Sequence, residues 1–545
     1  MKKPVSRRWD DETMLVAWLA SCVSLISLLV FLRNSNVLLY GDAVAHINIA
    51  RRVFDSRTPG LLQLGTVWLP LPHLLIIPFV VSDWMWQSGV GGSIPSMIAY
   101  VFGAAGIFRL VRGALSAGSA PSGATRVAAW TAALIYAANP NLIYLQSTAM
   151  TEPLYLALFV WAVVHFSEFV QAAGRDPRTA RASLLKCGWC LAAGCLTRYD
   201  GWFLAAAVGI AALGAIAAAA ERKALYGAFA KFALLAGAAP VLWLTYNAVV
   251  YRNALEFANG PYSAKAIERK TSQPGFPPHP GTDNLAEAAS YFLKSGELTM
   301  LENSWHRLWL ALALAGTLGV LIFERRLWPA LLLWTPLPFY MLSVAYGGVP
   351  IFVPPWWPFS LYNVRYGLEL LPAFAVFGVL AVNLTARSIP WAGARAVLAA
   401  ALVVFAAASY AIVWRVQPVS FREAWVNSRT RIALEEELGN SLRQLPPTSS
   451  FLMYLGAHPG ALQRTAIPLR RLIYEGNHRS WIQPSDPEGL WEKALADPAA
   501  YANYVVASEG DPVARGVEMR DLSTLLVIHV TGQPPLTIYR TSRSR

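Results

Sequence analysis

An acid and a histidine stand four residues apart just after the first hydrophobic segment of the chain. Asp42 and His46 belong to the stretch Gly41-Asp-Ala-Val-Ala-His-Ile-Asn-Ile-Ala-Arg51, which has the pattern of a short amphipathic helix lying on a membrane surface. Residues four apart share one face of a helix, so the carboxylate and the imidazole can act on the same substrate. A general base at this position suits a substrate carried by a lipid.

Each of these two side chains also has a structural interpretation. Asp is a common N-cap residue, and Asp42 precedes a helix expected to begin at Ala43. A capping carboxylate stays ionised, so both roles are compatible. His46 could orient Asp42, hold a divalent metal ion with it, or form a hydrogen bond at the interface. Asp42 is therefore the catalytic candidate, and His46 is a supporting or metal-binding candidate.

A second acid stands at the expected start of another hydrophobic helix. Glu152 is followed by Pro153, which suits the first turn of a helix because its missing N–H costs nothing there. A second acid recurs in active sites where an acceptor hydroxyl is deprotonated or a metal is held. The alternative is a structural role, since a negative charge is favoured at a helix N-terminus. We include Glu152 among the catalytic candidates.

Four arginines are candidates for binding a phosphate group, because a guanidinium can bind two oxygens at once. They are Arg365, Arg51, Arg52 and Arg198. The competing interpretation of Arg365 is an anchor at the membrane interface. For Arg198, it is an ion pair with the nearby Asp200.

Hydrophobic helices must position these residues. The chain has 545 residues, of which 55% are hydrophobic and only 14% are charged, against roughly 25% charged in a soluble domain. The net charge of +13 would suggest nucleic acid in a soluble chain. Here, however, Lys and Arg lie in short runs between apolar segments, as the positive-inside rule requires. Composition therefore predicts a multi-pass membrane protein that contacts the lipid bilayer and binds no nucleic acid.

The hydrophobic segments predict about eleven transmembrane helices, from residues 14–32 to residues 396–414, with a cytoplasmic N-terminus and an outer C-terminus. Residues 66–81 are ambiguous. Pro70, Pro72 and Pro78 favour a juxtamembrane helix that does not cross. This choice places the Lys and Arg clusters inside, and puts Asp42 and Glu152 on the outer face.

The composition changes near residue 415. Residues 1–414 are expected to form a transmembrane catalytic module with outer loops at 33–93, 251–304 and 346–365. Residues 415–545 are expected to form a soluble α/β domain on the outer face. Its predicted elements are a helix over 429–445 and strands at 451–455, 504–508, 525–530 and 536–539.

The order of these features resembles the GT-C superfamily of polyprenyl-phosphate-sugar glycosyltransferases, in particular the bacterial protein O-mannosyltransferases and the aminoarabinose transferases of lipid A. The resemblance covers roughly residues 10–415. Its motifs are the Asp42 stretch, Trp68-Leu-Pro-Leu-Pro-His73, Glu152-Pro153, Thr197-Arg-Tyr-Asp-Gly201 and Arg365-Tyr366. Two departures stand out. Many members carry Asp-Glu where this chain has Asp42-Ala43, and Lys-Pro-Pro where it has Trp68-Leu69-Pro70.

The resemblance implies transfer of a sugar from a polyprenyl-phosphate donor to a hydroxyl-bearing acceptor, with inversion, on the outer face of a bacterial inner membrane. The first-loop acid of the family maps onto Asp42, as the base or the acceptor-positioning carboxylate. Because the family's lysine is absent, Arg365, Arg51 or Arg52 is left to contact the donor phosphate. The residues expected to line the groove for lipid and sugar are Tyr40, Trp68, His73 and Tyr366.

Two other functions stay open on the sequence. A transporter or flippase of lipid-linked glycans predicts charges and broken helices near the bilayer midplane and some internal symmetry, whereas the candidate charges here lie at the outer surface. A non-catalytic scaffold of the same fold is the third possibility. The sequence identifies neither the sugar nor the acceptor. It requires no cofactor beyond the divalent metal ion considered for His46.

Overall fold

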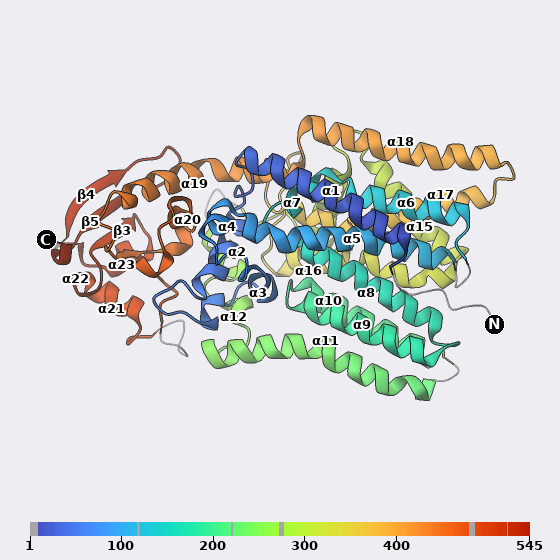
Figure 1. Cartoon of the computed structure of the whole chain (residues 1–545), viewed down its shortest axis with the longest axis horizontal. Coiled ribbons are helices and arrows are strands. Elements are labelled where there is room, and N and C mark those ends of the chain that lie inside the picture. The colour runs from blue at the N-terminus through green and yellow to red at the C-terminus, as the bar shows by residue number, and fades with distance from the viewer. Residues whose placement is uncertain are drawn as a thin grey trace.

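Long apolar helices form one end of the molecule and a small sheet forms the other (Figure 1). The computed structural model describes residues 9–116, 120–219, 222–271, 277–478, 486–519 and 522–544. The basic N-terminal stretch 1–8, which was expected to be cytoplasmic, lies outside the described residues.

Eight helical segments in the described part of the chain are long and apolar enough to cross a membrane. They are α1 (Asp11–Arg33), α5 (Val90–Ser116), α8 (Glu152–Ala172), α10 (Asp200–Ala217), α11 (Arg222–Tyr251), η2 (Arg325–Trp334) with α16 (Pro336–Tyr346), η3 (Val364–Leu370) with α17 (Leu371–Arg387), and α18 (Ala392–Val416), continued by α19 (Val419–Arg443). Three shorter or less apolar helices belong to the bundle: α6 (Gly123–Ala137), α9 (Pro177–Cys195) and α15 (Arg307–Ile322). The expected count of about eleven spans is met only if these three also cross, so it stays a prediction.

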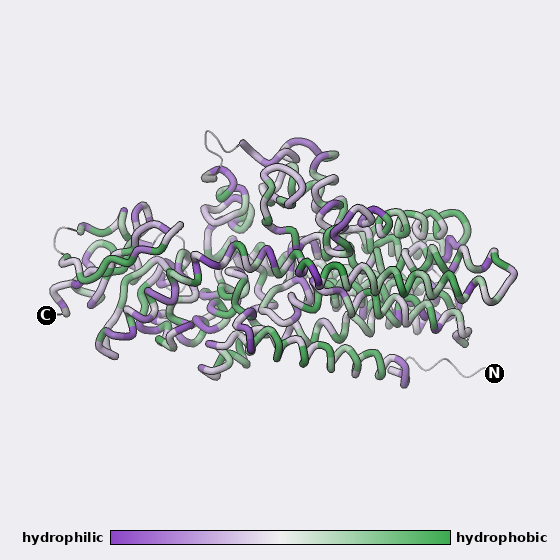
Figure 2. The backbone as a smooth tube through the Cα atoms, turned by 90° about the horizontal axis from the view of Figure 1, so that it is seen from above, coloured by the Kyte–Doolittle hydropathy of each residue, from purple (hydrophilic) through white to green (hydrophobic). Residues whose placement is uncertain are grey.

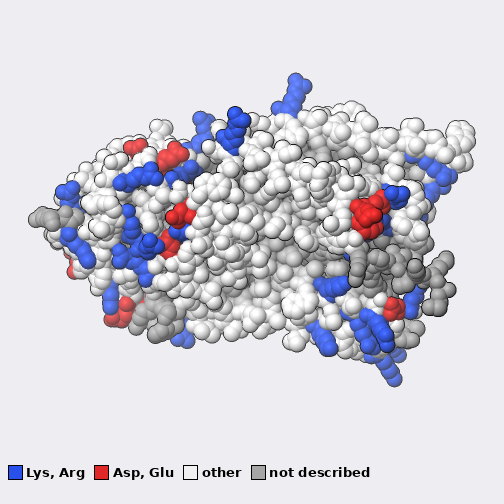
Figure 3. Space-filling view, in the orientation of Figure 1, with Lys and Arg blue, Asp and Glu red and all other residues white. Residues whose placement is uncertain are grey.

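The surface of the bundle is apolar. Large hydrophobic side chains on its helices point outward, among them Leu29, Ile210, Leu234 and Val404. Figure 2 shows hydrophobic residues along the bundle and more hydrophilic ones around the sheet, and Figure 3 shows a broad band of this face that is almost free of charged side chains. In water such a surface would be unfavourable, whereas in lipid it is required. The chain is therefore a multi-pass membrane protein.

The ambiguous segment 66–81 does not cross. It contains only α3 (Leu71–Ile76), a helix of six residues with Pro70 as its N-cap. Six residues rise about 9 Å along a helix, against a hydrocarbon core of about 30 Å. A transmembrane helix over this segment is therefore excluded, and its juxtamembrane position stays a prediction.

Short helices cover the end of the bundle that faces the sheet (Figure 1). In the first loop they are α2 (Gly41–Arg52), η1 (Leu61–Leu64), α3 and α4 (Asp83–Ser88), and α7 (Pro140–Gln146) follows α6. The loop expected over 251–304 is largely helical, with α12 (Glu256–Asn259), α13 (Ala264–Thr271) and α14 (Leu285–Met300).

The described C-terminal part contains a five-stranded sheet in the order β2-β1-β3-β5-β4. The strands are β1 (Phe451–Met453), β2 (Leu472–Ile473), β3 (Tyr504–Ser508), β4 (Ser523–Ile528) and β5 (Leu536–Arg540). β1 runs parallel to β2 and β3, while β5 runs antiparallel to β3 and β4. The short helices are η4 (Leu455–Ala457), α20 (Ala461–Thr465), η5 (Leu469–Arg471), α21 (Leu490–Ala496), α22 (Pro498–Tyr501), α23 (Pro512–Gly516) and η7 (Ser542–Ser544). Four of these strands and α19 confirm predicted elements, although α19 begins ten residues earlier than expected.

The hydrophobic core is continuous from the bundle into the sheet. Phe451 and Val506, on one face of the sheet, belong to the same cluster of buried residues as the transmembrane helices. Leu452 and Val505, their neighbours along the strands, point to the opposite face and pack with Trp491 in a second cluster, as the alternation of side chains along a strand requires. The expected module boundary at residue 415 stays a prediction, because α18 and α19 follow each other with only residues 417–418 between them.

Two glycines allow η3 to pack tightly on α14. A Cβ on Gly367 would collide with the backbone of Ser295 and Gly296. We expect Gly367→Ala to destabilise the fold by about 1–3 kcal/mol, the usual cost of overpacking, and to lower the melting temperature in detergent. A Cβ on Gly214 in α10 would meet open space, so Gly214→Ala should be neutral or slightly stabilising. Equal melting temperatures for the two variants would contradict this packing argument.

Candidate active site

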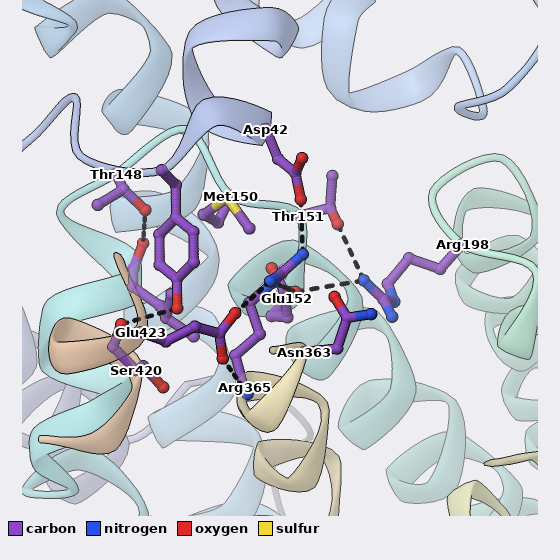
Figure 4. Close-up of polar contacts among 12 residues, drawn as sticks. Asp42, Thr148, Met150, Thr151, Glu152, Arg198, Asn363, Arg365, Ser420 and Glu423 are labelled. Carbon is purple, nitrogen blue, oxygen red and sulfur yellow. Dashed lines mark hydrogen bonds and ion pairs between the residues drawn. The ribbon is translucent and has the colours of Figure 1, made fainter. Parts of the chain in front are cut away.

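Arg365 is surrounded by three carboxylates at the end of the bundle that faces the sheet (Figure 4). Its Nη2 lies 2.5 Å from Oδ2 of Asp42, its Nε 3.1 Å from Oε1 of Glu152, and its Nη1 2.5 Å from Oε1 of Glu423. The backbone N–H of Arg365 also donates to Oε2 of Glu423 over 3.2 Å. All three guanidinium nitrogens are therefore engaged by acids.

Arg198 extends the same network on its other side. Its Nε donates to Oδ2 of Asp200 (3.0 Å), and its Nη2 donates to the hydroxyl of Tyr340 (2.7 Å) and lies 3.1 Å from Oε1 of Glu369. Its Nη1 lies 3.5 Å from Oε1 of Glu152, the oxygen that also accepts from Arg365. The expected pairing with Asp200 is confirmed, and Glu152 joins the two arginines into one arginine–carboxylate cluster.

Two tyrosines pack against the guanidinium groups of this cluster. Cζ of Arg365 lies 5.0 Å from the ring centroid of Tyr40 and 4.9 Å from that of Tyr366. Cζ of Arg198 lies 5.0 Å from the ring centroid of the same Tyr366. Such cation–π contacts hold a guanidinium in place without using its N–H groups. Tyr40 and Tyr366, which were expected to line a groove, thus lie at the cluster itself.

Of the three acids around Arg365, Asp42 is the accessible one. Its side chain is 41% exposed, whereas those of Glu152 and Glu423 are 1% and 2% exposed. A ligand therefore reaches Arg365 from the side of Asp42. Oε2 of Glu152 is buried without a hydrogen-bond partner among the described residues. A buried oxygen left unpaired is costly, so it favours a bound group that can donate to it.

The first turn of α2 presents Asp42 to Arg365. Tyr40 is the N-cap of α2, so the interpretation of Asp42 as an N-cap is wrong: Asp42 lies inside the first turn, with its carboxylate directed at the guanidinium. The start of α2 is held by α19, because the Tyr40 hydroxyl donates to the carbonyl of Ser420 (2.7 Å) and Nη2 of Arg431 donates to that of Leu39 (2.9 Å).

The other acids reach the cluster from helix ends. Asn139 caps α7 by accepting from the N–H groups of Asn141 and Leu142, and the chain then turns so that Glu152 opens α8. The positive end of the α8 dipole favours the carboxylate there. Glu423 comes from α19, whose first turn is fixed by a hydrogen bond of 2.9 Å from the Ser420 N–H to Oδ1 of Asn141.

The arrangement of the whole chain matches solved structures. The sequence matches no protein-family model and no curated protein. The structure aligns with that of ArnT from Cupriavidus metallidurans bound to undecaprenyl phosphate, with a TM-score of 0.59, 12% identity and 98% of each chain covered. It aligns with the same protein in the apo state with a TM-score of 0.57, 13% identity, and 96% of this chain and 97% of that chain covered. The chain has a GT-C fold.

In the described part of this GT-C fold, the side chain of His46 forms a hydrogen bond with His73 and with no member of the cluster. Its Nδ1 lies 2.8 Å from Nε2 of His73, and its ring centroid lies 4.8 Å from that of Trp68. In the part of the chain that is described, no three His, Cys, Asp or Glu side chains are grouped as metal ligands would be. The guanidinium of Arg365 also fills the place among the acids that a cation would need. The described residues of the cluster therefore do not fit a metal ion.

The buried histidine pair makes the stability of the GT-C fold sensitive to acid. Burial lowers the pKa of His46 to about 4 and the pKa of His73 well below 6.5. The unfolded chain therefore binds protons that the fold excludes, and the free energy of unfolding falls as the pH drops below about 6.5, by up to about 1.4 kcal/mol per pH unit for each histidine. We expect a melting temperature that changes little above pH 7 and falls between pH 6.5 and 4. A His46→Gln, His73→Gln variant should lose much of this slope, and an unchanged slope would contradict the assignment.

The two arginines at the end of α2 lie outside the cluster. Arg51 pairs with Asp55 (3.0 Å) and Asp83 (2.7 Å). Arg52 donates its Nε to the carbonyl of Gln63 (2.7 Å), and its Cζ lies 5.8 Å from the ring of Tyr474. Both therefore connect α2 to its surroundings, and neither is placed beside Asp42.

Four members of the cluster were missed on the sequence: Glu423, Glu369, Tyr340 and Thr151, whose hydroxyl accepts from Nη1 of Arg198 (3.2 Å). The sequence did contain a signal for Glu369, because a charged residue inside an apolar helix is rare and commonly functional. Glu423 carries no such sign, since it lies in a polar segment far from Arg365 in the chain.

An apolar cavity of about 800 Å³ runs along α8 in the bundle of the GT-C fold. Along α8 its lining residues recur every three or four positions, from Leu154 through Trp161 to His165, a span of about 16 Å. Leu154 follows Glu152 by two residues and so points to a different face of α8. Leu74 and Leu75 of α3 line the same cavity. None of the four residues expected in a groove belongs to its described lining.

Proposed function

We propose that this protein is a membrane glycosyltransferase that moves a sugar from a polyprenyl-phosphate donor to a hydroxyl-bearing acceptor, with inversion at the anomeric carbon. The observation that carries the proposal is the geometry at Arg365. An accessible carboxylate, Asp42, lies on the one open side of a guanidinium whose other carboxylate partners are buried. We propose that Asp42 acts there as the base and Arg365 as the phosphate-binding group.

Asp42 is the base in the proposed reaction. The acceptor hydroxyl attacks the anomeric carbon while its proton passes to Asp42. The bond from that carbon to the phosphate oxygen breaks, and polyprenyl phosphate leaves with the electron pair. Attack from the face opposite the leaving group inverts the configuration. A general base of this kind contributes on the order of 100- to 10,000-fold in rate.

Arg365 stabilises the leaving phosphate. In this structure its Nη2 is bonded to Asp42, and the donor phosphate takes the place of Asp42 at that nitrogen. The exchange frees the carboxylate to accept the acceptor proton and brings a positive charge to the oxygen on which negative charge develops. Glu152 and Glu423 hold the guanidinium in position throughout.

The apolar cavity supports a lipid-linked donor. It is lined mainly by hydrophobic side chains of α5 and α8, with Leu74 and Leu75 of α3, and this is the kind of surface that a polyprenyl chain needs. The alignment with ArnT bound to undecaprenyl phosphate supports the same class of donor. We place the enzyme in the inner membrane of a bacterium, with the cluster and residues 415–545 on the extracytoplasmic side, as the positive-inside rule favours.

A transfer assay tests the proposal. The purified protein in proteoliposomes is incubated with polyprenyl phosphate carrying a radiolabelled sugar and with a panel of hydroxyl-bearing acceptors. Release of polyprenyl phosphate together with a labelled acceptor is the expected result. A flippase would move the labelled lipid across the bilayer without releasing polyprenyl phosphate, and a scaffold would do neither. Either outcome would overturn the proposal.

A further inference from the structure

A second cleft lies in the sheet module, apart from the arginine–carboxylate cluster. It has a volume of about 460 Å³ and opens at the carboxyl ends of β1 and β3. Tyr454 and His458 follow β1, residues 508–512 end β3 and begin α23, and Tyr262 comes from the segment after α12. The volume is that of a small-molecule site, commonly about 300–1,000 Å³.

The order of the strands produces a crevice at the carboxyl ends of β1 and β3. From β1 the chain continues to β2 on one side, whereas β3 lies on the other side of β1, next to β5. The connections that follow β1 and β3 therefore diverge at their carboxyl ends. In open α/β sheets, ligands bind at such a topological switch point.

A buried nitrogen in this cleft has no partner. His458 is only 6% exposed, and its Nε2 makes no hydrogen bond among the described residues. A buried polar atom left without a partner costs free energy, so it favours a ligand that completes the hydrogen bond. The residue that carries this nitrogen lines the cleft.

The other side chains of the cleft select against an anion. Arg515 is the one cation of the described lining, against Glu509 and Asp511, so the cleft carries an excess of negative charge. Both oxygens of Asp511 already accept N–H groups, from Ser508 (2.8 Å) and Ala514 (2.6 Å). A phosphate or a uronate would be repelled here, whereas a neutral group with many hydroxyls finds acceptors.

Two tyrosines supply the faces that a sugar ring needs. Tyr262 and Tyr454 both line the cleft, and Tyr262 is 45% exposed. An aromatic ring packs against the C–H groups of a sugar while its hydroxyl bonds to those of the sugar, because tyrosine combines an apolar body with a polar tip.

The cleft and the arginine–carboxylate cluster share one helix, α19. Leu434 of α19 lines the cleft, and Glu423 of the cluster lies eleven positions earlier on the same helix, a separation of about 16 Å. Next to Leu434, Glu435 accepts a hydrogen bond from the N–H of Gly460 (2.9 Å) and pairs with Arg431 (2.7 Å). Arg431 in turn donates to the carbonyl of Leu39 at the start of α2. A chain of a few sugar rings can span this distance.

We infer that the cleft is a binding site for a neutral saccharide, and that it holds the sugar part of the acceptor while the hydroxyl to be modified reaches Asp42. Binding of the saccharide stands on the cleft alone. Its assignment as the acceptor rests on the proposed glycosyltransferase function.

An oligosaccharide array tests the inference. The full-length protein in nanodiscs is labelled with a fluorophore and applied to printed neutral, anionic and amino-sugar oligosaccharides and to peptides. Neutral oligosaccharides should be retained. Tyr262→Ala, which removes an exposed ring, and His458→Phe, which keeps a ring without its nitrogens, should each weaken retention about tenfold. Tyr346→Ala removes a tyrosine that is 52% exposed elsewhere and should leave retention unchanged.

The two proposals fail in different ways. Asp42→Asn should retain neutral oligosaccharides as the wild type does while losing transfer. If the wild type retains neutral sugars but transfers none, the saccharide site stands and the proposed glycosyltransferase function is overturned. No retention of a neutral oligosaccharide, retention of only anionic sugars or of peptides, or equal retention by Tyr262→Ala and Tyr346→Ala would each overturn the saccharide site.

Discussion

Replacing Asp42 with Asn is expected to lower the rate of sugar transfer about 100- to 10,000-fold, the contribution of a general base. Asn keeps the size of the side chain but binds Nη2 of Arg365 less strongly than a carboxylate does, so the donor phosphate should displace it at least as readily and donor binding should be kept. The Asn side chain cannot take up the proton of the acceptor hydroxyl, and this loss slows the transfer. Transfer rates at saturating donor, measured in proteoliposomes, give the size of the effect.

Asp83 provides the matched control. It is also a first-loop aspartate bound to an arginine, in this case Arg51 (2.7 Å), and its side chain is 70% exposed. It does not touch Arg365 or Arg198 in the described contacts. Asp83→Asn should therefore leave transfer within about twofold of the wild type, because surface ion pairs contribute little. Similar rates for Asp42→Asn and Asp83→Asn would remove Asp42 as the base.

Replacing Arg365 with Met is expected to destabilise the fold by about 3–5 kcal/mol, the usual result of removing one partner from a buried ion pair. The change leaves Glu152 and Glu423 buried close together without the guanidinium between them. The repulsion between the two carboxylates and the loss of their hydrogen bonds to Arg365 both lower the stability of the fold. The melting temperature in detergent should drop, and transfer should be lost even where the protein stays folded.

Two further variants separate charge from general damage. Arg365→Met combined with Glu423→Gln removes one of the stranded charges and should recover part of the lost stability. Arg387 pairs with Glu324 on the surface, where its side chain is 44% exposed, so Arg387→Met should cost about 0–1 kcal/mol. Equal melting temperatures for the two single variants would show that Arg365 does not balance buried acids.

Local chemistry was sufficient to find most of the cluster. Asp42, Glu152, Arg198 and Arg365 were recognised because an acid can act as a base and an arginine can bind a phosphate at the ends of apolar segments. The structure brings these four side chains into one network. It does not bring His46, Arg51 or Arg52 into that network. Helical spacing places residues on one face of their own helix, and it does not decide which neighbour that face meets.

The sequence by itself determined that this is a multi-pass membrane protein with a small α/β module at its C-terminus, because hydrophobic length and strand alternation are local properties of the chain. Only the tertiary structure decided that Arg365 is held by three acids, one of them Glu423 from α19, and that a second cleft opens beside His458. Asp42 and Arg365 are separated by 323 positions. Contacts over such separations depend on how the helices pack against one another, and no local pattern of residues records that packing.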